Sequence, residues 1–369
     1  MTSAPASTRR AAAAAPIGPR FAARLADRAV DVVLLLGRLV GRLLGGPSGP
    51  VGRPLAAGWR RLLRSIGVRS DALTAPSTLG MRRLAVAGVV INTLIIVSGG
   101  LVRLTTSGLG CPTWPRCTPE SLLPSAHTDV PTSRMAIEFG NRMVTFLLLA
   151  VAICVFIAAA HLRRTRPDLV RLAVVLPLGV LGQILLGGVT VLTHLNPIAV
   201  GSHYLLSALV LAVAVWLHVR TTEGDTPPRL TLGALPYRVA YALPALGFLV
   251  LAAGTVVTGS GPHAGDETAR RYDFLGASTI QTVARVHSGL VWVTVAAAVA
   301  LYVLARRDGA TLVLVRLRTL GAVILAQGVI GYVQYALGVP AWLVLLHMLG
   351  SALFWIALLR VRFAVRVRT

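Results

Sequence analysis

Four polar side chains share one face of an otherwise apolar stretch, "IEFGNRMVTF" at residues 137–146. Glu138, Asn141, Arg142 and Thr145 follow the spacing i, i+3, i+4 and i+7, so in a helix they form one stripe. Ionisable groups are costly inside a membrane and mark a functional site when they occur there. The carboxylate can accept a proton or stabilise a cationic intermediate, and the arginine can hold an anionic group of a ligand. The structural alternative is an i, i+4 ion pair that only satisfies itself.

Three of the eight histidines lie inside long apolar runs. His203, His287 and His347 each lie roughly five to nine residues from one end of a run, which is a depth of about 7–13 Å at the helical rise. A lone buried histidine is more often a hydrogen-bonded core residue than a ligand. Three at matched depth favour ligation. The other histidines lie in connecting segments or at the ends of runs: His127, His161, His194, His218 and His263.

The elements that carry these side chains are predicted to be membrane-spanning helices. The chain is 55% hydrophobic with a mean hydropathy of +0.74, which indicates a polytopic, all-α integral membrane protein. Runs of about 20 apolar residues, the length that crosses a hydrocarbon core, occur near 84–102, 136–160, 170–191, 199–219, 239–259, 279–304, 312–335 and 341–360.

The net charge of +23 comes from arginine alone, since the chain contains no lysine. The arginines gather in tails and in alternate connecting segments, which favours membrane topology over nucleic-acid binding. The positive-inside rule puts both termini in the cytoplasm and the segments 103–135 and 260–278 outside.

"GLGCPTWPRC" in the first outer segment carries Cys111 and Cys117. Its prolines favour turns that bring the two sulfurs together, so we expect a disulfide. Metal binding is the weaker alternative.

The chain also repeats itself. Gln327 follows Gln183, and His347 follows His203, by the same interval (327 − 183 = 347 − 203 = 144). This predicts two pseudo-symmetric four-helix bundles.

The division into domains follows from that repeat. We expect a largely flexible, basic cytoplasmic arm at 1–83, an N-terminal half at 84–220, a linker at 221–238 and a C-terminal half at 239–369. Within the arm, "RAVDVVLLLGRLVGRLLGG" can form an amphipathic helix on the membrane surface.

Axial ligation of haem between facing helices fits histidines that are far apart in sequence. A zinc site would instead require a tight cluster with carboxylate or thiolate ligands at short spacing. Small residues near the histidines leave room for a flat macrocycle, or serve ordinary helix packing: Gly187, Gly188, Ser202, Gly289, Gly331 and Gly350.

Several stretches together resemble the haem A synthase family, in particular its actinobacterial-type members. They are "GGLVRLTTSGLGCPTWPRC", "IEFGNR" and "LLGGVTVLTHLNP" with "SHYLLS", followed by His287 and His347 in the second half. The resemblance covers about residues 84–360. It implies an oxidoreductase that converts the haem O ring methyl to the formyl group of haem A and carries haem b as cofactor.

Carried over by position, the resemblance implies that His287 and His347 are the axial ligands of haem b. It implies that His203 binds the iron of the substrate haem and that Glu138 is the essential acid beside it. It further implies a bacterial cell membrane location and functional links to the haem O-producing prenyltransferase and to terminal oxidase assembly. Whether the chain forms a homo-oligomer is left open.

One residue departs from the family pattern, which is commonly Glu-x-x-His. This chain has "EFGN", so Asn141 stands where the second axial histidine of the N-terminal site is expected. An amide is a poor ligand for haem iron compared with imidazole. We therefore expect a sixth position that is vacant or holds water. Replacement of the missing ligand by His127 or His194 is the alternative. The loop cysteines, Cys111 and Cys117, match a pair found in many members.

Three other function classes fit the sequence less well. A di-haem cytochrome b type electron-transfer protein is the main alternative, but it needs two fully ligated haems, and Asn141 argues against this. A transporter more typically has broken helices and charged groups at mid-membrane. A prenyltransferase needs paired aspartates for magnesium pyrophosphate, and none of the 13 acidic residues forms such a pair within a span.

Overall fold

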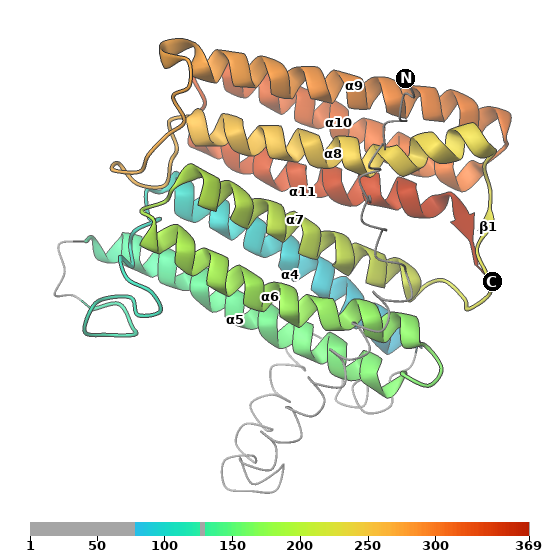
Figure 1. Cartoon of the computed structure of the whole chain (residues 1–369), viewed down its shortest axis with the longest axis horizontal. Helices are drawn as coiled ribbons and strands as arrows, with labels where there is room; N and C mark the ends of the chain where they lie inside the picture. The colour runs from blue at the N-terminus through green and yellow to red at the C-terminus, as the bar shows by residue number, and fades with distance from the viewer. Residues whose placement is uncertain (1–77, 126–129, 369) are drawn as a thin grey trace, which may run out of the picture. The chain divides into compact units, whose positions relative to one another are not determined.

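The computed structural model describes residues 78–125 and 130–368, and in this part of the chain it confirms an all-α membrane protein (Figure 1). Eight of its helices are long and apolar enough to cross a membrane. They are α4 (Thr78–Leu104), α5 (Thr132–His161), α6 (Pro167–Leu192), α7 (Pro197–Arg220), α8 (Ala234–Ser260), α9 (Thr279–Arg307), α10 (Thr311–Ala336) and α11 (Ala341–Ala364). The short elements are η1 (Gly276–Ser278), β1 (Arg229–Leu230) and β2 (Arg366–Val367).

Most helices extend a few residues beyond the predicted apolar runs. The clearest case is α4, which begins at Thr78, inside the segment expected to be a flexible arm. Met81 and Leu84 are buried, whereas Arg82 and Arg83 are exposed. The helix continues through these arginines because their apolar stems can cover hydrocarbon surface while the charged groups reach water. The predicted amphipathic stretch further upstream lies outside the described residues.

The helices of each half pack in a closed ring. In the first, α4, α5, α6 and α7 contact one another in order and α7 closes on α4; in the second, α8, α9, α10 and α11 do the same. Figure 1 draws the two rings side by side, with α4, α7, α8 and α11 along the seam between them. This arrangement fits the predicted pair of pseudo-symmetric bundles.

Polar contacts and apolar packing both stabilise the seam. The indole Nε1 of Trp355 on α11 donates a hydrogen bond to the carbonyl of Ala208 on α7 (2.8 Å). The hydroxyls of Tyr204 and Ser351 lie 2.7 Å apart on the same two helices. A large apolar core of described residues also spans this seam. The two halves are therefore held in a fixed relation at the level of the membrane.

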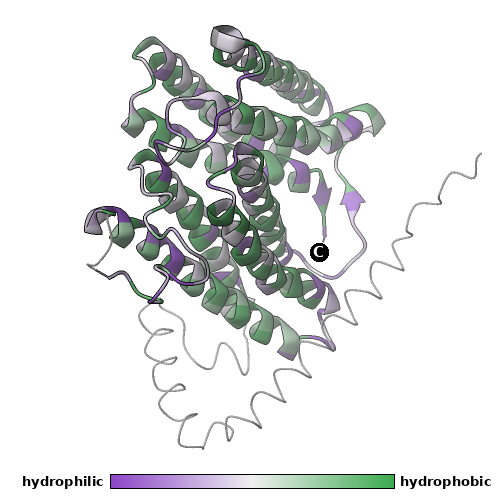
Figure 2. Ribbon diagram, turned by 60° about the vertical axis from the view of Figure 1, so that its left-hand side comes forward, coloured by the Kyte–Doolittle hydropathy of each residue, from purple (hydrophilic) through white to green (hydrophobic). Residues whose placement is uncertain are grey.

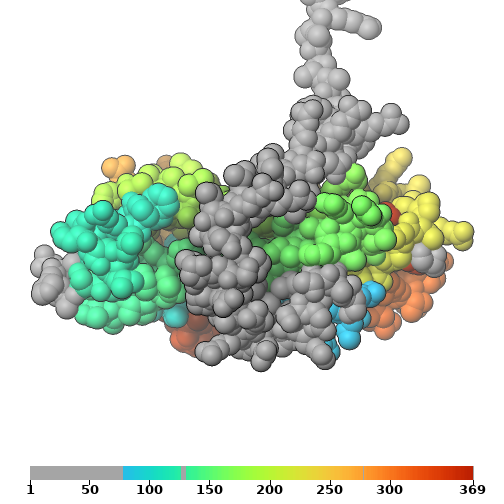
Figure 3. Space-filling view, turned by 90° about the horizontal axis from the view of Figure 1, so that it is seen from below, coloured from blue at the N-terminus to red at the C-terminus, as the bar shows by residue number. Residues whose placement is uncertain are grey.

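The connecting segments divide between the two ends of the helices. We name the end with residues 105–125, 130–131 and 261–278 the loop side. The end with residues 162–166, 221–233, 308–310 and 365–368 is the tail side. Seen from below, the teal loop-side residues and the yellow linker residues lie at opposite ends (Figure 3). Whether the tail side is cytoplasmic, as the positive-inside rule predicts, stays a prediction.

An ion-pair network fastens the tail side. Arg220, only 5% exposed, pairs with Asp168 and with Glu223, each at 2.6 Å. Arg366 of β2 also contacts Glu223 (3.4 Å), and β2 pairs with β1 in antiparallel register. The C-terminal tail is therefore joined to the linker between the two halves.

Large apolar side chains cover the outward faces of the helices. On α4, for example, Val90 is 60% exposed and Leu94 is 48% exposed, and Figure 2 shows the helices mainly in the hydrophobic colour with hydrophilic residues near their ends. An exposed apolar belt of this kind is what contact with lipid tails requires.

We expect Trp355→Phe to lower the free energy of unfolding by about 1 kcal/mol, because it removes an interhelical hydrogen bond from the seam. The matched control is Trp216→Phe, since Trp216 is 41% exposed. Thermal unfolding in detergent measures both. Equal shifts for the two variants would contradict a locking role for the Trp355 indole.

Candidate functional site

A large, mostly apolar cavity opens within the described helices. Its volume is about 1730 Å³, and residues of both rings line it. This exceeds the roughly 300–1,000 Å³ of an ordinary small-molecule site, so the space suits more than one large ligand. All of the site residues predicted inside the spans line this cavity: Glu138, Asn141, Arg142, His203, His287 and His347.

In the C-terminal half, two histidines reach the cavity from helices at opposite corners of the ring. His287 on α9 has its Nδ1 3.0 Å from the carbonyl of Val250 on α8. If Nδ1 carries the proton and donates it to that carbonyl, Nε2 keeps a free lone pair, which is the usual arrangement of a metal-ligating histidine. His347 on α11 lines the same cavity. The two histidines thus face one cavity from two different helices of the ring, and their role as axial haem ligands stays a prediction.

Each of the three intramembrane histidines packs its ring against a glycine of the preceding helix. A Cβ atom added at Gly254 would lie 3.3 Å from Cε1 of His287, and one added at Gly331 would lie 3.4 Å from Cε1 of His347. Gly187 faces His203 in the same way, at 3.4 Å. A larger residue at these glycines would press on the imidazole, so the glycines allow the rings to sit between the helices.

The N-terminal half repeats this arrangement around His203 on α7. The side chain of Gln183 on α6 donates a hydrogen bond to the His203 carbonyl (3.2 Å). The Nδ1 atoms of His203 and His347 are both buried, and neither has a hydrogen-bond partner. An unpaired buried polar atom is unfavourable unless it meets a ligand or a water molecule. His203 and His347 therefore have similar surroundings in the structure, as expected from the repeat interval that relates them in the sequence.

The difference between the halves lies across from that histidine. Asn141 on α5 accepts a hydrogen bond from the hydroxyl of Ser98 through Oδ1 (2.7 Å), which leaves its amide N–H groups free to donate. A Cβ added at Gly99 of α4, which lines the cavity next to Ser98, would meet no atom within 4 Å. The N-terminal half thus has open space and an amide where the C-terminal half has the His287 ring.

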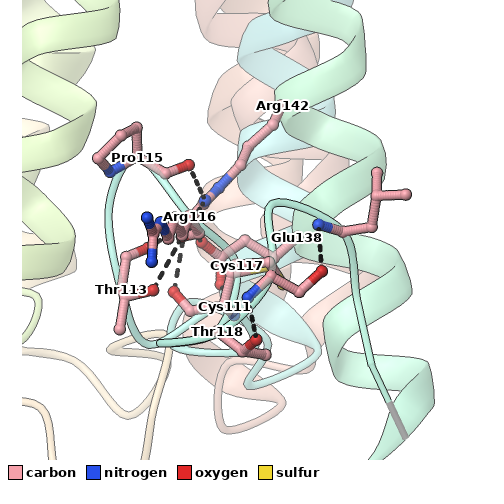
Figure 4. The surroundings of a disulfide bond; sticks show 10 residues. Cys111, Thr113, Pro115, Arg116, Cys117, Thr118, Glu138 and Arg142 are labelled. Atoms are coloured by element: carbon pink, nitrogen blue, oxygen red, sulfur yellow. Dashed lines mark hydrogen bonds and ion pairs between the residues drawn. A yellow bond between two sulfur atoms is a disulfide. The ribbon is translucent and has the colours of Figure 1, made fainter.

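Glu138 joins helix α5 to the loop that holds the two cysteines (Figure 4). Its carboxylate is 5% exposed, and it accepts hydrogen bonds from Arg142 (2.8 Å) and from the backbone N–H of Cys111 (2.6 Å). The predicted disulfide between Cys111 and Cys117 is confirmed, with a Cα–Cα distance of 4.3 Å. The buried acid and the disulfide therefore belong to one structural unit.

Arg142 of α5 also fastens the same loop. Besides Glu138, its guanidinium donates to four backbone carbonyls at 3.1–3.4 Å, those of Cys111, Thr113, Pro115 and Arg116. These contacts use both terminal nitrogens of Arg142. The sequence did not indicate this role, and the predicted contact with an anionic group of a ligand stays a prediction.

Two further residues border the cavity and were missed at the sequence level. Trp114 follows Cys111 in the loop and precedes a cis-proline bond, and it packs closely against Gly188 of α6. Arg103 on α4 donates to the carbonyl of Thr258 on α8 (2.6 Å), and its Nε is buried without a partner. Arg103 therefore bridges the two rings at the loop side. The sequence signal that could have identified Arg103 is its position, as a basic residue, at the end of an apolar run.

The remaining histidines do not join this group. His194 is exposed and does not line the cavity, and His127 lies outside the described residues. His263 lines the cavity, with Nε2 2.8 Å from the Val339 carbonyl. Within the described ranges, no three His, Cys, Asp or Glu side chains gather as a metal cluster. In this part of the chain the histidines therefore stand singly or in pairs.

Known proteins resemble parts of this chain. Three curated relatives carry the name Heme A synthase. That of Geobacillus thermodenitrificans is 28% identical over 158 residues, which are 41% of this chain and 48% of the relative. That of Listeria welshimeri is 29% identical over 181 residues, 47% of this chain and 57% of the relative. That of Geobacillus kaustophilus is 31% identical over 150 residues, 39% and 45% respectively. The matched part spans about half the length of these relatives.

A family profile gives the wider match. The profile of the cytochrome oxidase assembly proteins, COX15-CtaA, matches residues 82–359. This range contains the disulfide loop, both histidine sites and all or most of each of the eight spanning helices. The chain therefore belongs to the COX15-CtaA family of cytochrome oxidase assembly proteins.

Proposed function

We propose that this protein converts haem O to haem A by oxidising a ring methyl to a formyl group. The observation that carries the proposal is the difference between the two halves. One half has two histidines facing a shared cavity, and the other has a single histidine across from an amide, beside a buried carboxylate. One site suits a permanently bound cofactor, and the other suits a substrate that enters, reacts and leaves.

His287 and His347 are the residues that would hold haem b. The fit rests on Gly254 and Gly331, which admit the two rings between helices, and on the Val250 carbonyl, which can fix the tautomer of His287. The Nδ1 atom of His347 is buried and has no hydrogen-bond partner among the described residues. Haem b, when bound there, supplies one-electron redox chemistry.

In the N-terminal half, His203 would bind the iron of the haem O substrate. Asn141 is a poor ligand, but its amide N–H can donate a hydrogen bond to a water or to a substrate group in the open space near Gly99. One protein ligand makes release of the product easier than two would. The large apolar cavity suits the macrocycle.

Glu138 is the proposed catalytic proton acceptor. Conversion of a methyl to a formyl group is a four-electron oxidation that adds one oxygen atom. With water as the oxygen donor and an external electron acceptor it releases four protons, and a carboxylate at the cavity wall can accept one of them. The two hydrogen bonds from Arg142 and the Cys111 N–H stabilise its charged form and hold it in one orientation. The disulfide loop with Trp114 covers this end of the site and limits the access of water.

The wider setting belongs to the same proposal. We place the protein in the bacterial cell membrane with both termini in the cytoplasm, receiving haem O from the prenyltransferase that makes it. Its product would serve terminal oxidases. The second candidate, a di-haem cytochrome b type electron carrier, is favoured by the shared histidine arrangement but disfavoured by the amide at Asn141.

Pigment extraction tests the proposal and separates the two candidates. Protein purified from cells that supply haem O is expected to contain haem b and haem A. His287→Ala is expected to lose haem b and its low-spin absorbance, because one axial ligand is removed, whereas His194→Ala, at an exposed site, should keep both. Two haems of type b, with no haem A formed in any preparation, would support the electron carrier instead.

Replacing the acid separates its chemical role from its structural role. Glu138→Gln preserves the side-chain shape and can still accept the Cys111 N–H hydrogen bond, so we expect an intact disulfide loop and normal haem b content. The amide cannot accept a proton, so haem A should fall by at least about 100-fold and haem O or a partly oxidised product should accumulate. Normal haem A in the extracted pigment would return Glu138 to a structural role.

The open position beside Asn141 has a spectroscopic signature. Substrate-loaded protein is expected to give a high-spin electron paramagnetic resonance signal from the N-terminal haem and a low-spin signal from the C-terminal one. Asn141→His should convert the first signal to low spin, because the open space at Gly99 of the cavity wall leaves room for an imidazole. Asn141→Leu, which has no ligand atom, is the matched control and should stay high-spin.

The opposite outcome is equally definite. Two low-spin haems in the unmodified protein would contradict the open site. If one of these signals disappeared in His127→Ala or His194→Ala, that histidine would be the missing ligand.

A further inference from the structure

Four basic side chains from four helices gather on the tail side, away from the haem cavity. They are His218 of α7, Arg360 of α11, Arg82 of α4 and Arg316 of α10, and we call them the basic cluster. Arg360 Nη1 donates to His218 Nδ1 at 3.4 Å. The positive charges of Arg82 and Arg316 act on both of these residues. The cluster lies at the seam, where helices of the two halves meet.

The described acidic residues of the tail side are engaged elsewhere. Asp168, Glu223 and Asp225 pair with arginines at the tail-side ends of α6 and α7, and Asp308 accepts the backbone N–H of Gly233 (2.8 Å). No ion pair joins any described carboxylate to the basic cluster.

The guanidinium of Arg360 is also incompletely paired. Its Nε is buried and has no hydrogen-bond partner. Like charges held together beside the hydrocarbon region are unfavourable without an anion. The basic cluster therefore has both the charge and a free donor for an anionic group.

An apolar groove leads away from the basic cluster along the membrane-spanning helices. This second cavity has a volume of about 190 Å³. Its lining is valine and isoleucine from α4, α7 and α11, with two members of the basic cluster at one end: Val86, Val89, Val90, Val215, Ile356, His218 and Arg360.

The groove opens outward along one face of α4. Val86 and Val90 are 42% and 60% exposed, and Arg82, Val86, Val90 and Leu94 follow at i, i+4 intervals on that face. A cationic end and a continuous apolar face are thus aligned along the direction in which a lipid tail lies.

We propose that this groove binds one anionic phospholipid, with its phosphate in the basic cluster and an acyl chain along α4. A basic pocket between spanning helices is the known chemistry for recognition of anionic headgroups. Free phosphate would use the arginines but not the apolar groove. A zwitterionic lipid would fill the groove, but the positive charge of its headgroup would be repelled by the basic cluster. The bound lipid would bridge α4 of one half to α10 and α11 of the other.

Native mass spectrometry of the full-length protein in detergent tests this assignment, with phosphatidylglycerol as the probe. We expect one phosphatidylglycerol to be retained per chain, and retention to weaken by about 10- to 30-fold in the double variant Arg82→Gln, Arg316→Gln. The matched control is Arg83→Gln, Arg318→Gln, which removes the same charge from adjacent positions on the same two helices and should retain the lipid. Thermal unfolding checks that both variants are folded.

Three outcomes would overturn the assignment. The first is equal retention in the two double variants, and the second is equal retention of phosphatidylcholine by the unmodified protein. The third is displacement of the lipid by millimolar inorganic phosphate, which would identify a phosphate site that makes no use of the groove.

Discussion

The hydrocarbon core of a membrane offers no hydrogen-bond partners, and this constraint governs the whole described part of the chain. Backbone groups are satisfied inside eight helices, so polar side chains within the spans must find partners on neighbouring helices or face a cavity. Trp355 bonds to a carbonyl across the seam, and Gln183 bonds to the carbonyl of His203. Several of the polar atoms left over, among them Nδ1 of His203 and of His347, lie on residues that line the large cavity. Unpaired polar atoms therefore help to locate the candidate site.

Within that constraint, the two rings share one scaffold. Both pack a histidine of the last helix against a glycine of the helix before it, at nearly the same distance. They differ on the second helix, where His287 reaches the cavity in one ring and Asn141 in the other. Under the proposed function, this exchange of imidazole for amide would change the number of haem ligands. The proposed division into cofactor site and substrate site depends on this one position.

The disulfide loop is held in place by a buried acid and an arginine of one helix. Glu138 and Arg142 belong to α5, but their hydrogen bonds are directed at the backbone of the loop beside Cys111. Trp114 and Pro115 of the same loop line the cavity. A substitution at Glu138 therefore disturbs the loop unless it preserves the shape of the side chain.

The sequence by itself determined the eight spans, the two halves, the histidines at matched depth and the pairing of Cys111 with Cys117. Each depends on a local property: the length of an apolar run, a fixed interval, or a short loop with turn-forming residues. Tertiary structure alone decided which groups meet. The bond from the Cys111 N–H to Glu138, the Ser98 contact that orients Asn141, and the gathering of Arg82, Arg316 and Arg360 at the seam all join helices distant in sequence. Helical periodicity gives the face on which a side chain lies, but not the neighbour that the face meets, because that depends on how the rings close and pack.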